Sequence, residues 1–368
     1  MEKIITIIDF LQTLAPLQLQ EPYDNAGLIT GNPLDVCKGI ICALDATEEV
    51  VSEAIVADAN LIVTHHPLIF KPLKSLSPTS AIKRDLLKAI KHDIAIYAIH
   101  TNYDNVIDGV NRALALSLKV KKESLAILSP LSGKICKLYF TVPKEFSEQV
   151  KNALFAAGAG KIGLYSECSF ETNGIGTFRP LEGSRPFIGE ASGLRETIEE
   201  LKLEVIFPIW LKDKVLEALK TSHPYQEVAY EVMMTENMHQ ETGAGMIAEL
   251  GAEMWPEQFL DYIKERLSLK SVRHTQWPQK PIKKLAFCGG SGSFLIKQAI
   301  ASGADAYLTA DLKYHDYFEA DGKILLVDIG HYESEIAAIG QLTKILMEKF
   351  PTFAVLQTKV VTNPVQYR

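Results

Sequence analysis

Short, continuously apolar runs alternate with helical patterns at both ends of the chain, and this rhythm constrains the fold most. In the first third, KGIICALD, NLIVTHHPLIF and IAIYAI are separated by ATEEVVSEAIVADA and SAIKRDLLKAIKHD. The last third resumes with KKLAFCGG, ADAYLTAD and KILLVDIG, followed by a helical pattern over residues 331–350. Runs that are apolar throughout predict strands buried on both faces. Strands separated by helices predict right-handed crossovers, and therefore an α/β fold with a mainly parallel sheet.

The middle of the chain resembles two copies of one strand–helix unit. KLYFTVPKEFSEQVKNALFAAG and KLEVIFPIWLKDKVLEALKTSH start about 65 residues apart, and each has a proline near the strand end and V-x-x-A-L in the helix. Strand candidates follow at residues 162–170 and 227–234. A duplicated β-α-β unit is typical of ferredoxin-like domains. We therefore predict a ferredoxin-like α+β domain at residues 129–241, inserted into a discontinuous α/β domain made of residues 1–128 and 242–368.

Length and composition exclude several classes of protein. The 368 residues suggest two or three domains, and the net charge of −7 argues against non-specific binding to nucleic acid, although a locally basic pocket stays open. The five cysteines are scattered and include no C-x-x-C pair, which favours a reducing compartment over a disulfide framework. Polar residues interrupt the apolar N-terminus, as in an amphipathic helix rather than a signal peptide. No stretch approaches the roughly 18 apolar residues of a membrane span, so we predict a cytoplasmic protein without membrane contact.

Three predicted strands end in side chains that can bind a metal ion. The run LIVT leads into His65 and His66, IAIYAI leads into His100 and Asp104, and ILLVDIG leads into His331 and Glu335. Ligands of open parallel sheets gather beyond the carboxyl ends of the strands, so these side chains are expected to meet. If His331 begins a helix, His331 and Glu335 lie four residues apart on one helical face and can reach a common ion.

Three imidazoles and two carboxylates are more ligands than one ordinary catalytic zinc site uses. They suit two ions about 3.5–4 Å apart, which lower the pKa of bound water toward neutrality. We therefore predict two divalent metal ions, of Zn, Fe, Mn or Co, since mixed nitrogen and oxygen ligands do not choose among them. Each motif alone has an ordinary structural explanation, and their combination favours the metal site. The predicted ligands are His65, His66, Asp104, His331 and Glu335.

Several further residues could serve the same pocket. Glu335 and His100 are our candidate catalytic residues, and His100 and His315 are either acid–base groups or hydrogen-bonded supports. Asp45 either faces the pocket or caps the helix that follows it. The glycine-rich segment Gly289–Gly292 follows a predicted strand and opens a predicted helix. Its amides could bind a phosphate, or the turn could only let the helix pack closely. In the middle domain, His223 is expected to serve packing, and Tyr225 and Tyr230 are expected to lie in the core of the insert or at a subunit contact.

Eight motifs, spread from residue 23 to residue 335, resemble one known family. They are YDNAGLITG, ALDAT, THHPLIF, AIHTNYDNVIDGVN, HPYQEVAY, CGGSGSF, TADLKYHDYFEA and DIGHYESE. Together they resemble the Nif-three-like family, whose bacterial members are usually named GTP cyclohydrolase 1 type 2 homologs. The resemblance implies that the histidines of HHP, the aspartate of HTN-x-D, and the histidine and glutamate of GHYESE are the metal ligands. It also implies a homo-oligomer, in the form of a toroidal hexamer, and a middle insert similar to small trimeric signalling proteins. Members of the family often have Trp at the position of Tyr23, so this chain differs in residue type but keeps an aromatic ring there.

Three hypotheses about function follow. The leading one is a metal-dependent hydrolase that resembles GTP cyclohydrolase 1 type 2 and acts on a nucleotide or other phosphorylated small molecule through metal-activated water. The alternative is a metal-binding regulatory or interaction protein without robust catalysis. The third, a nucleic-acid-associated protein threaded through the ring, is the least favoured because the net charge is acidic. Metal content, and metal-dependent product release from GTP, separate these hypotheses.

Overall fold

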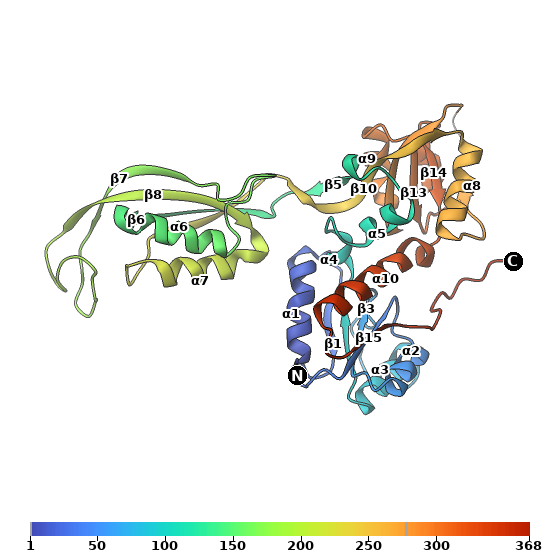
Figure 1. The fold of residues 1–368 in the computed structure, drawn as a ribbon, viewed down its shortest axis with the longest axis horizontal. Coiled ribbons are helices and arrows are strands. Elements are labelled where there is room, and N and C mark those ends of the chain that lie inside the picture. Colours follow the sequence, from blue (N-terminus) through green and yellow to red (C-terminus); the bar gives the residue numbers. More distant parts are fainter. Residues whose placement is uncertain (1, 277–278) are drawn as a thin grey trace. The chain divides into compact units, whose positions relative to one another are not determined.

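The computed structural model describes residues 2–276 and 279–368. The chain forms two compact units, which Figure 1 traces from the N-terminus to the C-terminus. The main unit combines both ends of the chain, Met1–Pro130 and Glu241–Arg368, and the inserted unit is Leu131–Gln240. The main unit therefore has to bring together segments that are more than a hundred residues apart in the sequence.

The first sheet of the main unit has five strands in the order β1-β4-β3-β2-β15. Its strands are β1 (Gly27–Thr30), β2 (Gly39–Ala43), β3 (Leu61–Thr64), β4 (Ala95–Ala98) and β15 (Ala354–Gln357). All neighbours are parallel except β1, which is antiparallel to β4. Every residue of β2, β3 and β4 is buried, which explains why their sequences are apolar throughout. Three helices flank these strands in the chain, α1 (Ile4–Leu14), α2 (Glu48–Val56) and α3 (Ala81–Lys91).

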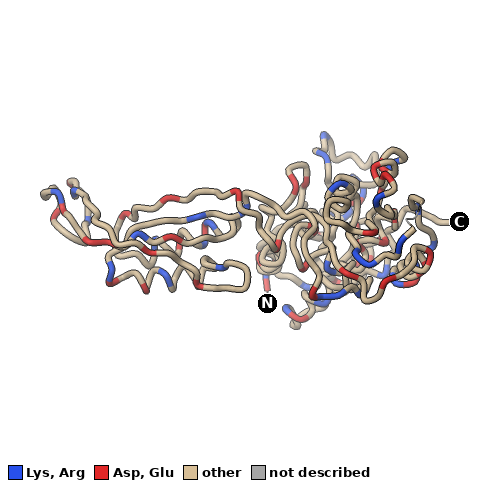
Figure 2. Tube along the Cα trace, turned by 90° about the horizontal axis from the view of Figure 1, so that it is seen from above, with Lys and Arg blue, Asp and Glu red and all other residues tan. Residues whose placement is uncertain are grey.

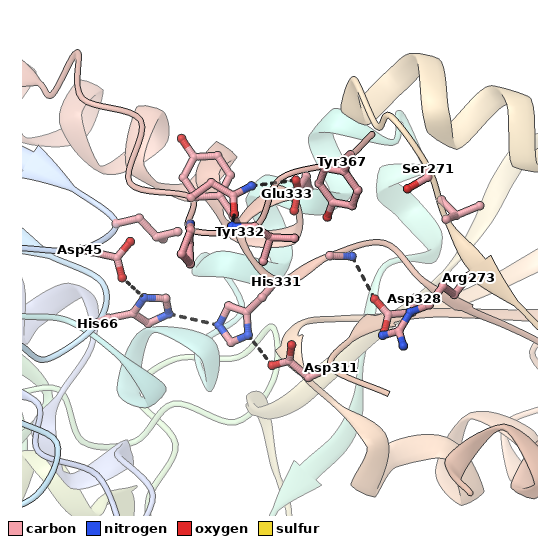
Figure 3. A pocket seen from close by; sticks show the side chains of 16 residues that line it. Asp45, His66, Ser271, Arg273, Asp311, Asp328, His331, Tyr332, Glu333 and Tyr367 are labelled. Atoms are coloured by element: carbon pink, nitrogen blue, oxygen red, sulfur yellow. Dashed lines mark hydrogen bonds and ion pairs between the residues drawn. The ribbon is translucent and has the colours of Figure 1, made fainter. Parts of the chain in front are cut away.

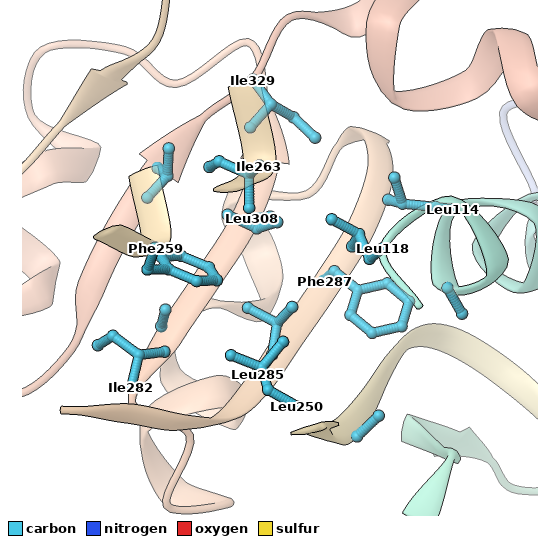
Figure 4. Packing of buried hydrophobic residues seen from close by; sticks show 14 of the residues in the cluster. Leu114, Leu118, Leu250, Phe259, Ile263, Ile282, Leu285, Phe287, Leu308 and Ile329 are labelled. Carbon is cyan, nitrogen blue, oxygen red and sulfur yellow. The ribbon is translucent and has the colours of Figure 1, made fainter. Parts of the chain in front are cut away.

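The second sheet has six strands in the order β11-β14-β13-β12-β10-β5 and is mixed. Its strands are β5 (Ala126–Leu131), β10 (His239–Met254), β11 (Arg273–His274), β12 (Ile282–Ser291), β13 (Ala306–Ala310) and β14 (Leu325–Asp328). The central strands β12, β13 and β14 are parallel, whereas β10 and β11 join them in antiparallel fashion. The helices beside them are α5 (Val110–Ser117), α8 (Pro256–Leu267) and α9 (Ile296–Ala301). Figure 4 shows Phe259 and Ile263 of α8 and Leu114 of α5 packed with Phe287 and Leu285 of β12.

One long helix, α10 (His331–Lys349), connects the two sheets of the main unit. It contacts β2 and β15 of the first sheet, β12 and β13 of the second sheet, and also α5. Its buried residues recur every three or four positions, and Ala338, Leu342 and Leu346 are examples. Because α10 begins directly after β14, its first turn lies where the strand ends of both sheets meet.

The inserted unit follows the order β-α-β-β-α-β. Its elements are β6 (Ile135–Pro143), α6 (Ser147–Ala156), β7 (Phe170–Phe178), β8 (Glu196–Pro208), α7 (Lys212–Ser222) and β9 (Tyr230–Thr235). The sheet order is β7-β8-β6-β9, and the neighbouring strands are antiparallel. The two helices contact each other. Alternate residues of β6 and β8, such as Phe140 and Leu203, pack with Val150 and Leu219 of the helices.

The strand predicted at residues 162–170 is wrong. Residues 162–165 form only an isolated bridge between Ile162 and Tyr165, and the strand begins at Phe170. Gly163 and Glu167 have φ values of 55° and 59°, which extended backbone does not adopt. The apolar residues of this segment suggested a strand, but Leu164 and Tyr165 are exposed and have no sheet to pack against.

Charged residues of both signs are interspersed along each unit, as Figure 2 shows. Among the described residues, no helix combines the length and the apolar composition that crossing a bilayer requires. All five cysteines carry free thiols, and Cys168 is the one that is not buried.

Asp85 of α3 is buried and gives a testable prediction about stability. Burial, together with the negative charges of the nearby Glu48 and Glu49 of α2, raises its pKa to about 6. A carboxyl whose pKa is higher in the folded than in the unfolded chain lowers stability once the pH exceeds about 4, and the full penalty is present above about 6. We therefore expect Asp85→Asn to raise the free energy of unfolding by about 1–3 kcal/mol at pH 8 and to leave it unchanged at pH 4. Urea unfolding at both pH values measures this, with the exposed Asp9→Asn as the control. A loss of stability at pH 8 would contradict the prediction.

Candidate metal centre

The predicted ligands lie on three segments that follow strand ends of both sheets. His65 and His66 come directly after β3, and α4 (Thr101–Asp104) ends at Asp104 shortly after β4. His331 is the first residue of α10, and Glu335 lies one turn later on the same helical face. Their nitrogen and oxygen atoms come within 3.2 Å of each other. The prediction that His331 begins a helix is confirmed.

The structure brings all five predicted ligands together around the Glu335 carboxylate. Its Oε2 lies 3.1 Å from His66 Nε2 and 3.2 Å from His331 Nε2. Its Oε1 lies 3.7 Å from His65 Nε2, which in turn lies 3.6 Å from Asp104 Oδ1. Glu335 is 2% exposed and His65 is 1% exposed, so the centre of the cluster is withdrawn from solvent, whereas His66, Asp104 and His331 are partly exposed.

Acceptors outside the cluster fix the orientation of each imidazole. His66 Nδ1 lies 2.8 Å from Asp45, and His331 Nδ1 lies 2.7 Å from Asp311. Figure 3 shows these four residues as a continuous row, with 3.2 Å between the two Nε2 atoms at its centre. His65 Nδ1 faces the carbonyl oxygen of Ile99 at 2.9 Å. Carboxylate and carbonyl oxygens can only accept hydrogen bonds, so the proton of each imidazole lies on Nδ1. The lone pair on each Nε2 is then able to bind a metal ion.

Several atoms of the cluster have unsatisfied bonding capacity. His65 Nε2, Asp104 Oδ1 and Glu335 Oε2 are buried and make no hydrogen bond to any of the residues that the structure describes. Buried polar atoms in folded proteins nearly always have a partner, because leaving one unpaired costs about 1–3 kcal/mol. A divalent cation among these atoms would satisfy all three. The residues therefore fit a metal ion in both geometry and donor type.

The pKa values show that protons compete for the same nitrogens. Burial lowers the pKa of His66, but the neighbouring carboxylates of Asp45 and Glu335 outweigh this effect and raise the pKa to about 10. Burial also lowers the pKa of His331, but the carboxylates of Glu335 and Asp311 outweigh this effect and raise the pKa to about 9. Burial also opposes ionisation of Glu335, yet the surrounding histidines hold its pKa well below the ordinary value. A metal ion that binds here displaces protons, so its affinity falls as the pH falls.

The potential ligands form three overlapping groups, in each of which the donor atoms lie within 4.8 Å of one another. The groups are His66–His331–Glu335, His65–Asp104–Glu335 and His65–His66–His100. The first two share Glu335, which presents a different oxygen to each. The third adds His100, whose Nδ1 lies 2.7 Å from the buried Asp24 carboxylate. Burial opposes ionisation of Asp24, but hydrogen bonds from His100 and Thr101 lower its pKa to about 2, so it stays charged.

A cavity opens on each side of the cluster. One, of about 450 Å³, is bordered by Asp104, His100 and the aromatic residues Tyr23, Phe70 and Phe294. The other, of about 630 Å³, is the one drawn in Figure 3. Arg273, Tyr332 and Tyr367 contribute to its wall. His66 and His331 border both cavities, so a molecule in either one can reach the cluster.

The chain is similar over its whole length to proteins of one family. The model of Duf34/NIF3 (NGG1p interacting factor 3) matches residues 2–364. The chain belongs to the DUF34/NIF3 family. A GTP cyclohydrolase 1 type 2 homolog of Bacillus subtilis is 38% identical over 363 residues, which cover 97% of this chain and 96% of the relative. A protein of the same name from Halalkalibacterium halodurans is 38% identical over 365 residues, with coverage of 98% and 97%.

Solved structures of DUF34/NIF3 relatives share the fold. A Bacillus cereus protein related to NIF3 has a TM-score of 0.88 at 37% identity and covers 100% of this chain and 99% of its own. Staphylococcus aureus protein SA1388 has a TM-score of 0.78 at 31% identity, with the same coverage. The family resemblance inferred from the eight sequence motifs is thus confirmed.

The glycine-rich segment of this DUF34/NIF3 protein does not form the phosphate-binding loop that we considered. The strand β12 continues through Ser291, so Gly289 and Gly290 are strand residues rather than the start of a helix. Their amides already donate to Asn111 Oδ1 and Ser334 Oγ, each at 2.9 Å, and are not free for a phosphate. A Cβ at Gly290 would overlap the Glu335 carboxylate. The glycine therefore lets β12 approach the candidate ligand Glu335, which supports the close-packing alternative.

Sequence reasoning missed two carboxylates that support the site. Asp24 orients His100, and Asp311 orients His331. Asp311 directly follows β13, so the strand-end signal that identified the candidate ligands was also present for this supporting carboxylate. Asp24 lies 76 residues from His100 and only the YDN motif pointed to it. Of the residues left open, Asp45 faces the pocket, whereas His315 is exposed and packs against Tyr314.

We expect Asp45→Ala to weaken metal binding about 10–100-fold while the fold stays intact. The carboxylate holds the proton on His66 Nδ1 and aims Nε2 at the cluster, so its removal frees the ring to rotate. Asp45→Asn, which keeps an acceptor oxygen but loses the charge, should fall between the wild type and the alanine variant. Competition of each variant with a chelator of known affinity measures the effect, and Asp261→Ala on the exposed side of α8 is the control. Equal affinities for all variants would contradict the role assigned to Asp45.

Proposed function

We propose that this DUF34/NIF3 protein is a dinuclear metal-dependent hydrolase. The observation that supports it is the sharing of Glu335 by two donor groups. One ion would be held by His65, Asp104 and Glu335 Oε1, and the other by His66, His331 and Glu335 Oε2. Ligand atoms about 2.0–2.2 Å from one ion in tetrahedral geometry lie roughly 3.4 Å from each other. The separations of 3.1–3.7 Å around Glu335 are close to that value.

The chemistry that such a pair of ions supplies is the activation of water near neutral pH. We assign proton transfer to and from this water to His100. Its Nδ1 is held by the ionised Asp24, so the remaining nitrogen, Nε2, is the atom that accepts or donates. Its ring centroid is 5.1 Å from that of His65 and 5.5 Å from that of His66.

We propose a nucleotide as the substrate. Three aromatic side chains border the cavity of about 450 Å³, and each has a solvent-exposed ring. Tyr23 is 65% exposed, Phe70 is 44% exposed and Phe294 is 63% exposed. Exposed rings that converge at the mouth of a polar cavity suit the stacking of a planar base. The name of the Bacillus subtilis relative, GTP cyclohydrolase 1 type 2 homolog, points to the same class of substrate.

The proposal extends to the assembly and the location of the protein. We propose a cytoplasmic homo-oligomer, in agreement with the hexamer that the family resemblance implies. For the inserted unit, we infer a ferredoxin-like fold. The β-α-β-β-α-β order and the strand order β7-β8-β6-β9 support this.

The test is hydrolysis of a nucleotide panel by the metal-loaded protein. One water opens the imidazole ring of GTP to a formamide and a second water releases its carbon as formate, whereas cleavage of a phosphate ester or anhydride releases phosphate, so both products are assayed. We expect one of the two to form only with metal, and Phe70→Ala to raise KM about tenfold because a base–aromatic stack contributes about 1–3 kcal/mol. Metal content should be the same in wild type and Phe70→Ala. Two bound ions without turnover of any nucleotide would favour the regulatory alternative.

A further inference from the structure

The inserted unit contains a cavity of its own, of about 430 Å³. It lies where the ends of β6 and β7 meet residues 180–188 and residues 225–229. Its wall combines aromatic and aliphatic side chains with polar ones, and the charged residues that line it are Arg185, Glu227 and Glu200 on β8. A cavity of this size accommodates a small molecule of one or two rings.

Glu200 is an unusual residue for this position. Alternation along β8 places Leu201 and Leu203 in the core, and the preceding Glu199 is exposed. Glu200 is only 8% exposed although it carries a carboxylate. In the part of the chain that the structure describes, no lysine, arginine or histidine forms an ion pair with it. A buried carboxylate without a cationic partner is costly, so a function for it is expected.

The neighbouring strand leaves room for this carboxylate. Gly174 of β7 is the register partner of Glu200. Two residues further on, a Cβ at Gly176 would overlap Glu200 Oε2. Neither glycine adopts a positive φ, so the backbone conformation does not require glycine at these positions. The space that the Glu200 side chain occupies explains the glycines instead. Any larger residue at position 176 would push the carboxylate away from the cavity wall.

Three aromatic rings face the same space. The Tyr225 ring lies 6.3 Å from Phe178 and 6.1 Å from Phe187, measured between centroids. The Tyr225 hydroxyl is buried and makes no hydrogen bond of ordinary geometry within the described residues. Burial, together with the nearby Glu200 carboxylate, raises the pKa of this phenol, so it stays a neutral hydroxyl. The cavity thus combines aromatic ring faces with a buried carboxylate that has no cationic partner among the described residues and with a neutral phenol beside it.

We propose that this cavity binds a small planar aromatic compound that carries a guanidine-like edge of adjacent N–H groups. Two parallel N–H donors match the two oxygens of a carboxylate, and such charge-assisted pairs are among the strongest hydrogen bonds in proteins. The ring of the ligand would stack against Phe178, Phe187 and Tyr225. This site is separate from the metal centre, and it would make the inserted unit a ligand-sensing module.

The test uses 2-aminobenzimidazole as the probe, titrated into the full chain by isothermal calorimetry. Quinoline, which has a similar size but no N–H donor, is the matched compound and should bind about tenfold more weakly or worse. We expect Glu200→Gln to weaken binding of 2-aminobenzimidazole about 10–100-fold, since a hydrogen bond to a charged group is lost. Glu199→Gln, the exposed neighbour, should bind like the wild type. Phe187→Ala should also weaken binding, and because this ring is 49% exposed the variant is expected to fold.

The variant Glu335→Gln, altered in the metal centre, separates the two sites. It should bind the probe like the wild type, and a loss of binding would assign the probe to the metal centre instead. The proposal is overturned if Glu200→Gln and Phe187→Ala both bind the probe as tightly as the wild type. It is equally overturned if the wild type does not bind the probe at concentrations of about 1 mM, which corresponds to roughly 4 kcal/mol.

Discussion

Glu335→Gln is expected to lower bound metal several-fold and metal-dependent turnover by about 1,000-fold or more. Glu335 presents one oxygen to His66 and His331 and the other to His65, so both donor groups lose their shared anionic ligand at once. Glutamine has the same shape, and the buried side chain is 2% exposed, so the change is in charge rather than packing. The three imidazoles also lose the carboxylate that they face, which leaves positive or neutral nitrogens close together without a bridging anion.

The matched control is Glu333→Gln on the first turn of the same helix. Glu333 points away from the cluster and accepts a hydrogen bond from Asn363 at 2.9 Å. We therefore expect this variant to keep the metal content of the wild type. Metal analysis after dialysis, together with the hydrolysis assay, measures both variants. If Glu335→Gln retains two ions per chain, the shared-carboxylate arrangement is refuted, whatever its effect on turnover.

Most of the candidate site could be predicted from the sequence because its potential ligands obey local rules. His65, His66 and Asp104 follow apolar runs that are long enough to be recognised as buried strands, and parallel strands end at a common edge. His331 and Glu335 are four residues apart at the start of a helix, which fixes their relative direction without any knowledge of the fold. Such rules concern residues that are close in the sequence. They identify the potential ligand atoms but do not give the distances between them.

The remaining features depend on contacts between distant segments, which no local pattern encodes. Asp24 supports His100 across 76 residues. The glycines of β12 looked like a phosphate-binding turn, and only the position of Glu335 and the hydrogen bonds of the amides show that they serve packing. In the inserted unit, the apolar residues Leu164 and Tyr165 led us to predict a strand that starts before the observed one. Both side chains are exposed, and apolar residues indicate a buried strand only where another surface covers them.

The second large effect is expected in the core beneath the site, at Phe287. This ring is fully buried on β12, and its strand neighbours are Met246 of β10 and Leu308 of β13. Figure 4 shows it facing Leu118 of the chain after α5. We expect Phe287→Ala to lower the free energy of unfolding by about 3–5 kcal/mol, the cost of lost burial plus a cavity. Urea unfolding of the metal-free protein measures this, which keeps the result independent of metal binding.

Phe294→Ala is the matched control, because the same residue type lies a few positions further along but is 63% exposed. Its free energy of unfolding should stay within about 0.5 kcal/mol of the wild type. The strand β12 also carries Gly289 and Gly290, which approach the Glu335 carboxylate. Loosening the strand at Phe287 should therefore also weaken metal retention, although Phe287 is not a ligand. A variant that loses stability but keeps the full metal affinity would show that the centre is held by α10 and the first sheet alone.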